Sequence, residues 1–294
     1  MGDELIKTRT IFDTIKETWA LFRLMMFGGT SSSEDLYNFL STHNSLAENS
    51  HYINMGYWKS ADTFDTACQA LAEELGLCGD LNTDSVVLDC GNGHGDQDAF
   101  FLDRFSPESI TGLNITRKHV EIAQSRFKDP RLTFTHGSAT QIPFEAGAFN
   151  RVLALESAFH FDTRDDFFAE AFRVLEPGGR LATADLIRAS NDLTFIMKLG
   201  ERAGRAFWQI PQANLYDAKD YKERMEMAGF INIEIVDITE HVFLPFKRFA
   251  QERVQDPVVA QRVHPMIRAA WAKENSGQHN FAYILASGEK PASS

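Results

Sequence analysis

Residues 84–95 read DSVVLDCGNGHG, an apolar run that ends in an acid and breaks into alternating glycines. Residues 86–88 are typical of a short buried strand, because β-branched and apolar residues are bounded there by turn formers. The three glycines allow a tight turn and let a bulky ligand approach the backbone amides. Asp89 ends the strand, at the edge of an open α/β sheet where ligands bind. Taken alone, the stretch is equally compatible with an ordinary glycine-rich turn.

From residue 84 onward, strand-like and helix-like segments alternate. We expect strands near 85–89, 109–114, 131–136, 150–155, 180–186, 231–237 and 280–287. We expect helices between them near 97–105, 117–127, 164–175 and 217–228. This alternation predicts an α/β fold, in which helices cover both faces of a parallel sheet.

The remaining segments are expected to cover this sheet domain. Residues 1–76 are predicted to form a helical N-terminal cover, with an amphipathic helix over 4–27, an aromatic loop at 51–58 and a helix over about 61–76. Residues 77–294 would then form the main domain. Two segments of this domain, 188–216 and 244–276, are longer than the usual short loops between strands and helices. We expect helical covers there.

The composition limits the classes of function. A formal net charge of −12 argues against a nucleic-acid substrate, although a few local Arg or Lys could still hold a phosphorylated one. Three cysteines without a CxxC pattern predict neither a disulfide framework nor a zinc site, and the histidines lack ligand spacing, so no metal is expected. The chain start lacks the pattern of a signal peptide, and no apolar run reaches membrane-spanning length. We therefore expect a cytoplasmic protein without stable membrane insertion that binds a small molecule, and a homo-oligomer stays open.

The glycine spacing separates two nucleotide-binding alternatives. A nicotinamide-binding fold would show G-x-G-x-x-G and an acid ending the second strand. Here the spacing is G-x-G-x-G after Asp89, and no phosphate-binding pattern follows. The loop is therefore predicted to hold a nucleoside without phosphates.

Residues 89–95 (DCGNGHG) resemble the first motif of class I S-adenosylmethionine-dependent methyltransferases. Three more motifs follow in the family's order: TGLNIT at 111–116 in the second strand, GSA at 137–139 with IPF at 142–144 beside the adenine, and LEPGG at 175–179 before the fifth strand. The resemblance implies a Rossmann-like, seven-stranded, mostly parallel sheet whose last strand is antiparallel. It also implies S-adenosylmethionine as methyl donor and S-adenosylhomocysteine as product.

Two outer segments narrow the resemblance to the small-molecule branch. Residues 51–58 resemble the H-x-G-Y-W loop of antibiotic sugar O-methyltransferases and tocopherol-type C- and N-methyltransferases. Residues 207–211 and Tyr221 resemble the substrate-covering segment of the tocopherol-like branch.

The resemblance implies a set of cofactor-binding residues in the loops after the strands. The set is Tyr57, Trp58, Asp89, Gly91, Asn92, Gly93, Gly95, Asn114, Ile115, Ser138, Ala139 and Glu156. Asn114 departs from the family, because an acid usually grips the ribose hydroxyls there; Asn114 could supply one hydrogen bond. Asn150 replaces a usual Asp, which we interpret as structural, and Glu156 could instead cap a nearby turn. Tyr57 and Trp58 could equally be core residues.

The acceptor side is implied by the ends of the fourth and fifth strands. Methyl transfer needs alignment and exclusion of water, and a hydroxyl acceptor also needs a base. By resemblance, His160 lies beside the methyl and could take a proton near neutral pH, or only bond locally. Asp185 could bind the acceptor, orient a base, or be an exposed loop acid. The expected acceptor-pocket residues, which could also be simple packing, are Phe159, Trp208, Tyr216 and Tyr221.

Together these patterns predict a methyltransferase acting on a hydroxyl of a small, largely apolar metabolite of secondary metabolism. C-methylation of a prenyl, alkene or aromatic carbon stays open, since aromatic walls would stabilise a developing cation. N-methylation also stays open. Alternatives of another class are a non-catalytic nucleoside-binding protein and a nicotinamide-dependent oxidoreductase.

Overall fold

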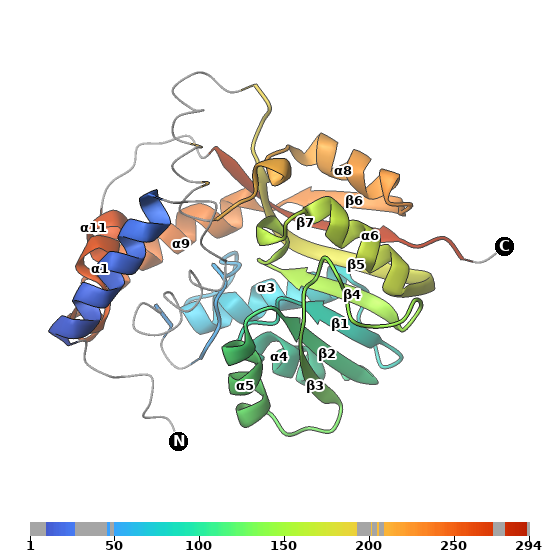
Figure 1. The fold of residues 1–294 in the computed structure, drawn as a ribbon, viewed down its shortest axis with the longest axis horizontal. Coiled ribbons are helices and arrows are strands. Elements are labelled where there is room, and N and C mark those ends of the chain that lie inside the picture. The colour runs from blue at the N-terminus through green and yellow to red at the C-terminus, as the bar shows by residue number, and fades with distance from the viewer. Residues whose placement is uncertain are drawn as a thin grey trace.

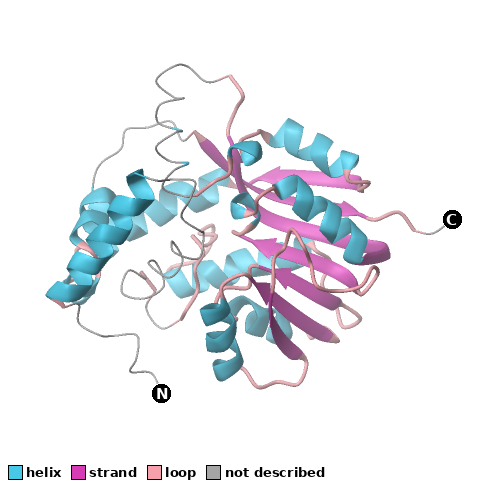
Figure 2. Ribbon diagram, in the orientation of Figure 1, coloured by secondary structure: helices cyan, strands magenta, loops and turns pink. Residues whose placement is uncertain are grey.

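The computed structural model describes residues 10–26, 46–47, 50–192, 201, 205, 209–272 and 280–292. Within them, seven strands form one sheet with helices on both faces (Figure 1) (Figure 2). The strands are β1 (Val86–Cys90), β2 (Ser109–Asn114), β3 (Leu132–His136), β4 (Phe149–Leu155), β5 (Leu175–Arg188), β6 (Ile231–Asp237) and β7 (Phe281–Glu289). Their order across the sheet is β3-β2-β1-β4-β5-β7-β6.

The predicted mostly parallel sheet is confirmed. β1 pairs in parallel with β2 and β4, and β3 and β5 extend the parallel part on either side. β7 runs antiparallel to both β5 and β6, as expected for the last strand. The carboxyl ends of the first five strands therefore meet at one edge of the sheet.

The sequence of β1 explains its central position. Val87 belongs to the apolar cluster on one face of the sheet, and Leu88 and Cys90 belong to the cluster on the other. A strand that is covered on both faces is apolar at successive positions, because successive side chains point to opposite faces. The run VVL is therefore buried on both sides.

Helices cover the two faces separately. α3 (Phe64–Cys78) and α4 (Asp96–Phe105) share a cluster with Val87, whereas α6 (Arg164–Val174) and α8 (Ala218–Met227) share the cluster with Leu88. α5 (Arg117–Arg126) packs on Phe134 of β3 through Val120 and Ala123. A short turn of 3₁₀ helix follows β4, η1 (Ala158–His160), and another precedes α8, η2 (Gln212–Asn214).

The expected covers lie partly outside the described residues. α1 (Ile11–Met26), α9 (Thr239–Arg253) and α11 (Pro265–Ala272) gather beside the sheet in Figure 1, and α10 (Pro257–Arg262) joins the last two. The second expected cover thus begins at Thr239. Of 188–216, only 188–192, 201, 205 and 209–216 are described.

The expected boundary at residue 76 falls inside α3. Thr63 caps this helix, because its hydroxyl oxygen accepts from the Thr66 N–H. Leu71 and Leu75 of α3 are fully buried in the cluster that includes Val87. α3 is therefore a layer of the sheet domain.

In the described parts of the chain, no helix combines the length and apolar character needed to cross a membrane.

Candidate active site

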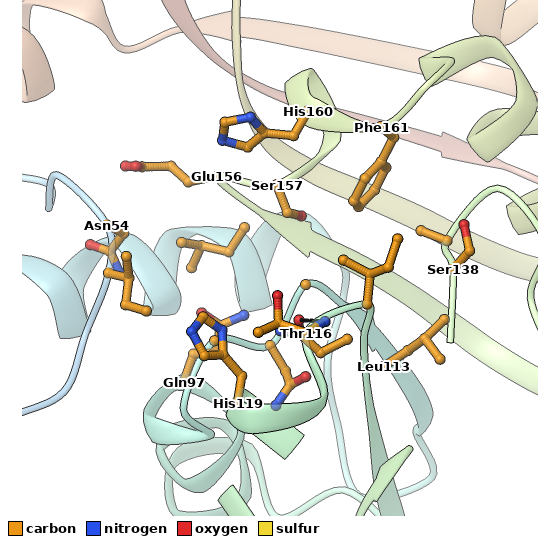
Figure 3. A pocket seen from close by; sticks show the side chains of 18 of the residues that line it. Asn54, Gln97, Leu113, Thr116, His119, Ser138, Glu156, Ser157, His160 and Phe161 are labelled. Carbon is orange, nitrogen blue, oxygen red and sulfur yellow. Dashed lines mark hydrogen bonds between the residues drawn. The ribbon is translucent and has the colours of Figure 1, made fainter. Parts of the chain in front are cut away.

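A cavity of about 500 Å³ lies at the carboxyl ends of β1, β2 and β4 and the loop after β3 (Figure 3). Glu156, Ser157 and His160 project from the end of β4 on one side, and Thr116 and His119 lie on the other. The predicted site residues that line the cavity are Gly91, Asn92, Gly93, Asn114, Ile115, Ser138, Ala139, Glu156 and His160. The ends of parallel strands thus bring together residues from separate segments of the chain.

The glycine loop needs its glycines where it passes closest to β4. Gly91 has φ +91°, and a Cβ there would overlap the Ser157 side chain. Gly93 has φ +54° and faces open space apart from Ile53. Both residues lack a side chain, and their backbones form part of the cavity wall. Gly95, by contrast, begins α4 against Phe127 and does not line the cavity.

Asp89 does not point into the cavity, contrary to the expectation from its place at the strand end. Its side chain is fully buried, and Oδ2 accepts a hydrogen bond from Gln97 Nε2 at 2.5 Å. Asp98 faces it as a hydrogen-bonded partner. Burial raises the pKa of Asp89 to about 6, and burial together with the neighbouring Asp89 raises the pKa of Asp98 well above its usual range. Asp89 thus supports the loop and orients Gln97, which does line the cavity.

Glu156 joins the aromatic loop to the sheet. Its Oε1 accepts from the Met55 N–H at 2.7 Å and from the Tyr283 hydroxyl at 2.9 Å. The residue has φ +48°, an uncommon conformation for a side chain other than glycine. Burial raises the pKa of Glu156 to about 7. Glu156 therefore lines the cavity while fixing residues 51–58 across it.

At the end of β2, the Asn114 side chain forms a hydrogen bond within its own loop. Its Oδ1 accepts the Thr116 N–H at 2.9 Å, which forms an Asx turn at the start of α5. Thr116 and His119 line the cavity just beyond this turn. Polar groups at this wall therefore come from the turn and the first helical residues as well as from Asn114.

Three histidines that the sequence did not indicate as site residues, His51, His94 and His119, form a histidine wall of the cavity. His94 packs edge-on against His119 at 4.5 Å and against His51 at 5.8 Å between ring centroids, and all three line the cavity. Burial lowers the pKa of His94 to about 3 and that of His119 to about 4, so both are neutral near pH 7. Their place in the sequence could have indicated two of them, because His94 lies inside the glycine motif and His51 in the aromatic loop. The other missed lining residues include Asn54, Gln97 and Thr116.

His160 ends η1 at the cavity edge. Its N–H donates to the Ser157 carbonyl at 3.0 Å, and its ring packs on Phe159 with centroids 3.9 Å apart. Phe159 itself is buried behind His160 and does not line the cavity. The expected pocket role of Phe159 is thus corrected to support of the histidine ring.

Asp185 cannot touch an acceptor, because it is fully buried away from the cavity. Its Oδ2 lies 2.9 Å from Arg164 Nε and accepts from the Tyr221 hydroxyl at 3.2 Å. The Arg164 guanidinium lies over the Tyr216 and Tyr221 rings. The expected acceptor contacts of Asp185, Tyr216 and Tyr221 are therefore corrected. Successive side chains of a strand point to opposite faces of the sheet, and Asp185 points to the face where Arg164 pairs with it.

Tyr57 and Trp58 are also core residues rather than cavity residues. The Tyr57 ring packs edge-on against His241, and Trp58 lies 5.1 Å from Phe249 between ring centroids. The Trp58 indole N–H donates to the Met55 carbonyl at 2.8 Å. They anchor the aromatic loop to α9. Trp208 lies outside the described residues.

The residues at the cavity fit the expected methyl donor. Gly91 and Gly93 add no side chain to the wall, and the lowered pKa values keep His94 and His119 neutral near pH 7. Asn54 Nδ2 is a buried donor without a partner among the described residues. An unpaired buried donor is costly unless a ligand satisfies it. No group of three or more His, Cys, Asp or Glu in the described chain is arranged to hold a metal ion.

Known proteins with similar sequences are methyltransferases. A family model described as a methyltransferase domain matches residues 88–183. Erythromycin 3″-O-methyltransferase of Saccharopolyspora erythraea is 33% identical over 271 residues, which cover 86% of this chain and 88% of that protein. Methyltransferase GfsG of Streptomyces halstedii is 31% identical over 204 residues, covering 66% of this chain and 70% of that protein.

Solved structures share the fold at lower identity. The cyclase SpnF matches with a TM-score of 0.70 and 21% identity, covering 90% of this chain and 98% of that one. Geranyl diphosphate C-methyltransferase from Streptomyces coelicolor A3(2) matches with a TM-score of 0.66 and 16% identity, covering 89% and 99%. Because the sequence match extends over most of both chains and the motifs converge on one cavity, the protein belongs to the class I S-adenosylmethionine-dependent methyltransferases of small molecules, and S-adenosylmethionine is its methyl donor.

Proposed function

We propose that the protein methylates a hydroxyl group of a small, largely apolar metabolite of secondary metabolism, with His160 as the base. The observation that carries the proposal is the position of His160, which lines the same cavity as Gly91, Gly93 and Glu156. A base must lie within reach of the proton that it takes, and the position of His160 in the cavity wall supports that role.

S-adenosylmethionine supplies an electrophilic methyl group bound to a sulfonium. In the proposed step, an oxygen lone pair of the acceptor forms the bond to the methyl carbon while the carbon–sulfur bond breaks. The bonding pair stays on sulfur as a thioether, and the hydroxyl proton passes to a ring nitrogen of His160. His160 later releases that proton to water. Exclusion of water from the reacting atoms when both substrates are bound would suppress methyl transfer to water.

Two groups of cavity residues could hold the two parts of S-adenosylmethionine. We assign the nucleoside to Asn114, Ile115, Ser138 and Ala139, where strands β2 and β3 end. We assign the amino-acid part to the glycine loop, including Asn92, and to Glu156, whose buried carboxyl lies beside Asn54 in the cavity wall (Figure 3). These assignments rest on cavity position and on the order of the family motifs.

The part of the cavity wall formed by residues 162 and 205–211 supports a hydroxylated, partly apolar acceptor. Asp162, Arg205 and Gln209 supply polar groups there, next to Ile210 and Pro211. The relative that is 33% identical is named for transfer to a 3″-oxygen, which supports an oxygen acceptor here as well.

The test uses methyl-deuterated S-adenosylmethionine with an erythromycin analogue that carries a free 3″-hydroxyl, and a panel of hydroxylated polyketides. Mass spectrometry detects transfer, and NMR identifies the methylated atom. We expect an O-methyl product, and a loss of 10²- to 10⁴-fold in turnover, roughly, for His160→Ala. His241→Ala is the control, because that ring packs on Tyr57 away from the cavity.

Two results would overturn the proposal. A methyl group found on carbon or nitrogen removes the hydroxyl assignment. Unchanged turnover of His160→Ala, with an O-methyl product, removes His160 as the base.

A further inference from the structure

We infer that Asn214 is a positioning residue that holds His160 in place through the two carbonyls on either side of it. The inference rests on the proposed role of His160 as base. Asn214 Nδ2 donates to the Phe159 carbonyl at 3.1 Å and to the Phe161 carbonyl at 2.7 Å. Its Oδ1 accepts the Arg164 N–H at 2.9 Å. One buried amide thus uses both of its protons and its oxygen on the backbone that surrounds His160.

A buried ion pair holds the same turn from the other side. Asp185 accepts the Leu186 N–H at 2.9 Å and pairs with Arg164. Arg164 donates to the Asn214 carbonyl at 3.1 Å and to the Leu186 carbonyl at 2.9 Å. Arg164 therefore holds Asn214, whose side chain in turn holds the Phe159 carbonyl.

The consequence for His160 is geometric. Its ring packs on Phe159, and its own N–H is held by Ser157, so its location follows from the backbone of residues 157–161. A displacement of about 1 Å at a reacting group can cost on the order of 10²-fold in rate. Holding both flanking carbonyls restricts that displacement.

Asn214 also connects the turn to a second part of the cavity wall. It ends η2, which follows the lining residues Gln209, Ile210 and Pro211. Ile210 is buried, and the Asn214 N–H donates to the Pro211 carbonyl at 3.0 Å. This wall segment and the proposed base are thus held by one residue that does not line the cavity.

A double-mutant cycle of Asn214→Ala and His160→Ala tests the inference. The acceptor is the compound found to be O-methylated in the preceding experiment, at saturating S-adenosylmethionine. We expect Asn214→Ala to lower kcat by about 10- to 100-fold in the wild-type background. In the His160→Ala background the same change should lower kcat by less than about 3-fold, because a residue that acts through His160 loses its effect when His160 is absent.

Asn150→Ala is the matched control. Asn150 also bridges two segments, donating to the Asp84 carbonyl at 2.9 Å and accepting the Val86 N–H at 2.8 Å. It lies at the amino end of β4, away from the cavity, so its loss should lower stability without lowering kcat. Asn214→Ser retains one donor and serves if the alanine variant does not fold. We expect an intermediate kcat for it.

A second readout needs no acceptor. In the complex with S-adenosylhomocysteine, the His160 Hε1–Cε1 NMR signal should shift or broaden in Asn214→Ala or Asn214→Ser, and remain unchanged in Asn150→Ala. An unmoved signal overturns the inference.

The kinetic outcomes separate the two proposals. Equal losses from Asn214→Ala in both backgrounds, or none in either, overturn the positioning role while His160 remains the base. If His160→Ala itself keeps full turnover, the base assignment fails and the positioning role falls with it.

Discussion

The carboxylate of Glu156 accepts the backbone N–H of Met55 at 2.7 Å, although 101 positions separate the two residues. The same oxygen accepts the hydroxyl of Tyr283 on β7. One side chain therefore fixes the aromatic loop, the end of β4 and the antiparallel strand. Its positive φ is maintained by these bonds, because an isolated chain would avoid that conformation.

Glu156 is expected to make stability depend on pH. Burial raises its pKa from the ordinary 4.5 to about 7. A raised pKa in the folded state contributes stability that is fully present below the unfolded value and is lost as the pH rises through the folded value. Glu156→Gln cannot ionise and keeps an acceptor for Met55. Between pH 5 and pH 8, the wild type should lose roughly 3 kcal/mol of unfolding free energy relative to this variant. Urea unfolding at both pH values measures the difference, and parallel pH dependences would contradict the assignment.

Gly91 is expected to tolerate no side chain. Gly91→Ala places a methyl group against Ser157 at φ +91°, so we expect loss of S-adenosylhomocysteine binding and destabilisation by about 1–3 kcal/mol. Gly178 is the matched control, since it has φ +83° but no atom within 4 Å of the place that a Cβ would occupy. Gly178→Ala should cost about 1 kcal/mol from the backbone alone and leave binding intact. Calorimetric titration and thermal unfolding distinguish the two, and equal affinities in both variants would refute the close-approach argument.

Asp98, which lies beside Asp89 under the glycine loop, is expected to tolerate replacement by asparagine. Because burial and the neighbouring Asp89 raise the pKa of Asp98, Asp98→Asn resembles the protonated acid and should change unfolding free energy by about 1 kcal/mol or less. Asp98→Ala removes the polar group and should cost roughly 3 kcal/mol. Chemical denaturation at pH 7 provides the comparison. A larger loss in the Asn variant than in the Ala variant would show that Asp98 is ionised.

Asp185 is expected to affect stability and rate but not acceptor affinity. Asp185→Asn leaves the buried Arg164 charge without its partner, which should cost about 3–5 kcal/mol. Because Asp185 is sealed from the cavity, the KM for the acceptor should stay within about 2-fold while kcat falls. Steady-state kinetics beside urea unfolding separates the two effects. A selective rise in KM would instead indicate contact with the acceptor.

The match between sequence and structure is best at the strand ends. The VVL run and the glycines after it carry local signals, since apolar runs and turn formers act through neighbouring residues. For that reason all seven expected strands appear, and Gly91, Asn92, Gly93, Asn114 and Glu156 line one cavity. The antiparallel last strand came from the resemblance to a family.

Side-chain direction was less predictable. Asp89 and Asp185 both lie near the ends of central strands, yet both point into layers beside the sheet, toward Gln97 and Arg164. Tyr57 and Trp58 lie in a motif of the aromatic loop but pack in the apolar cluster with α3 and α9. A one-residue change in strand register moves a side chain to the opposite face of the sheet. Sequence spacing does not specify which residues that side chain then contacts.

The sequence by itself determined the sheet and the glycine loop after β1, because these depend on short runs of residues with fixed spacing. Its resemblance to a known family implied the methyl donor. Only the tertiary structure decided which polar groups reach the cavity. It gathers His51, His94 and His119 into one wall, and it places Asn214 between the carbonyls that flank His160. The physical reason is that burial and pairing with distant residues set the charge and direction of a side chain, and such partners meet only when the chain folds.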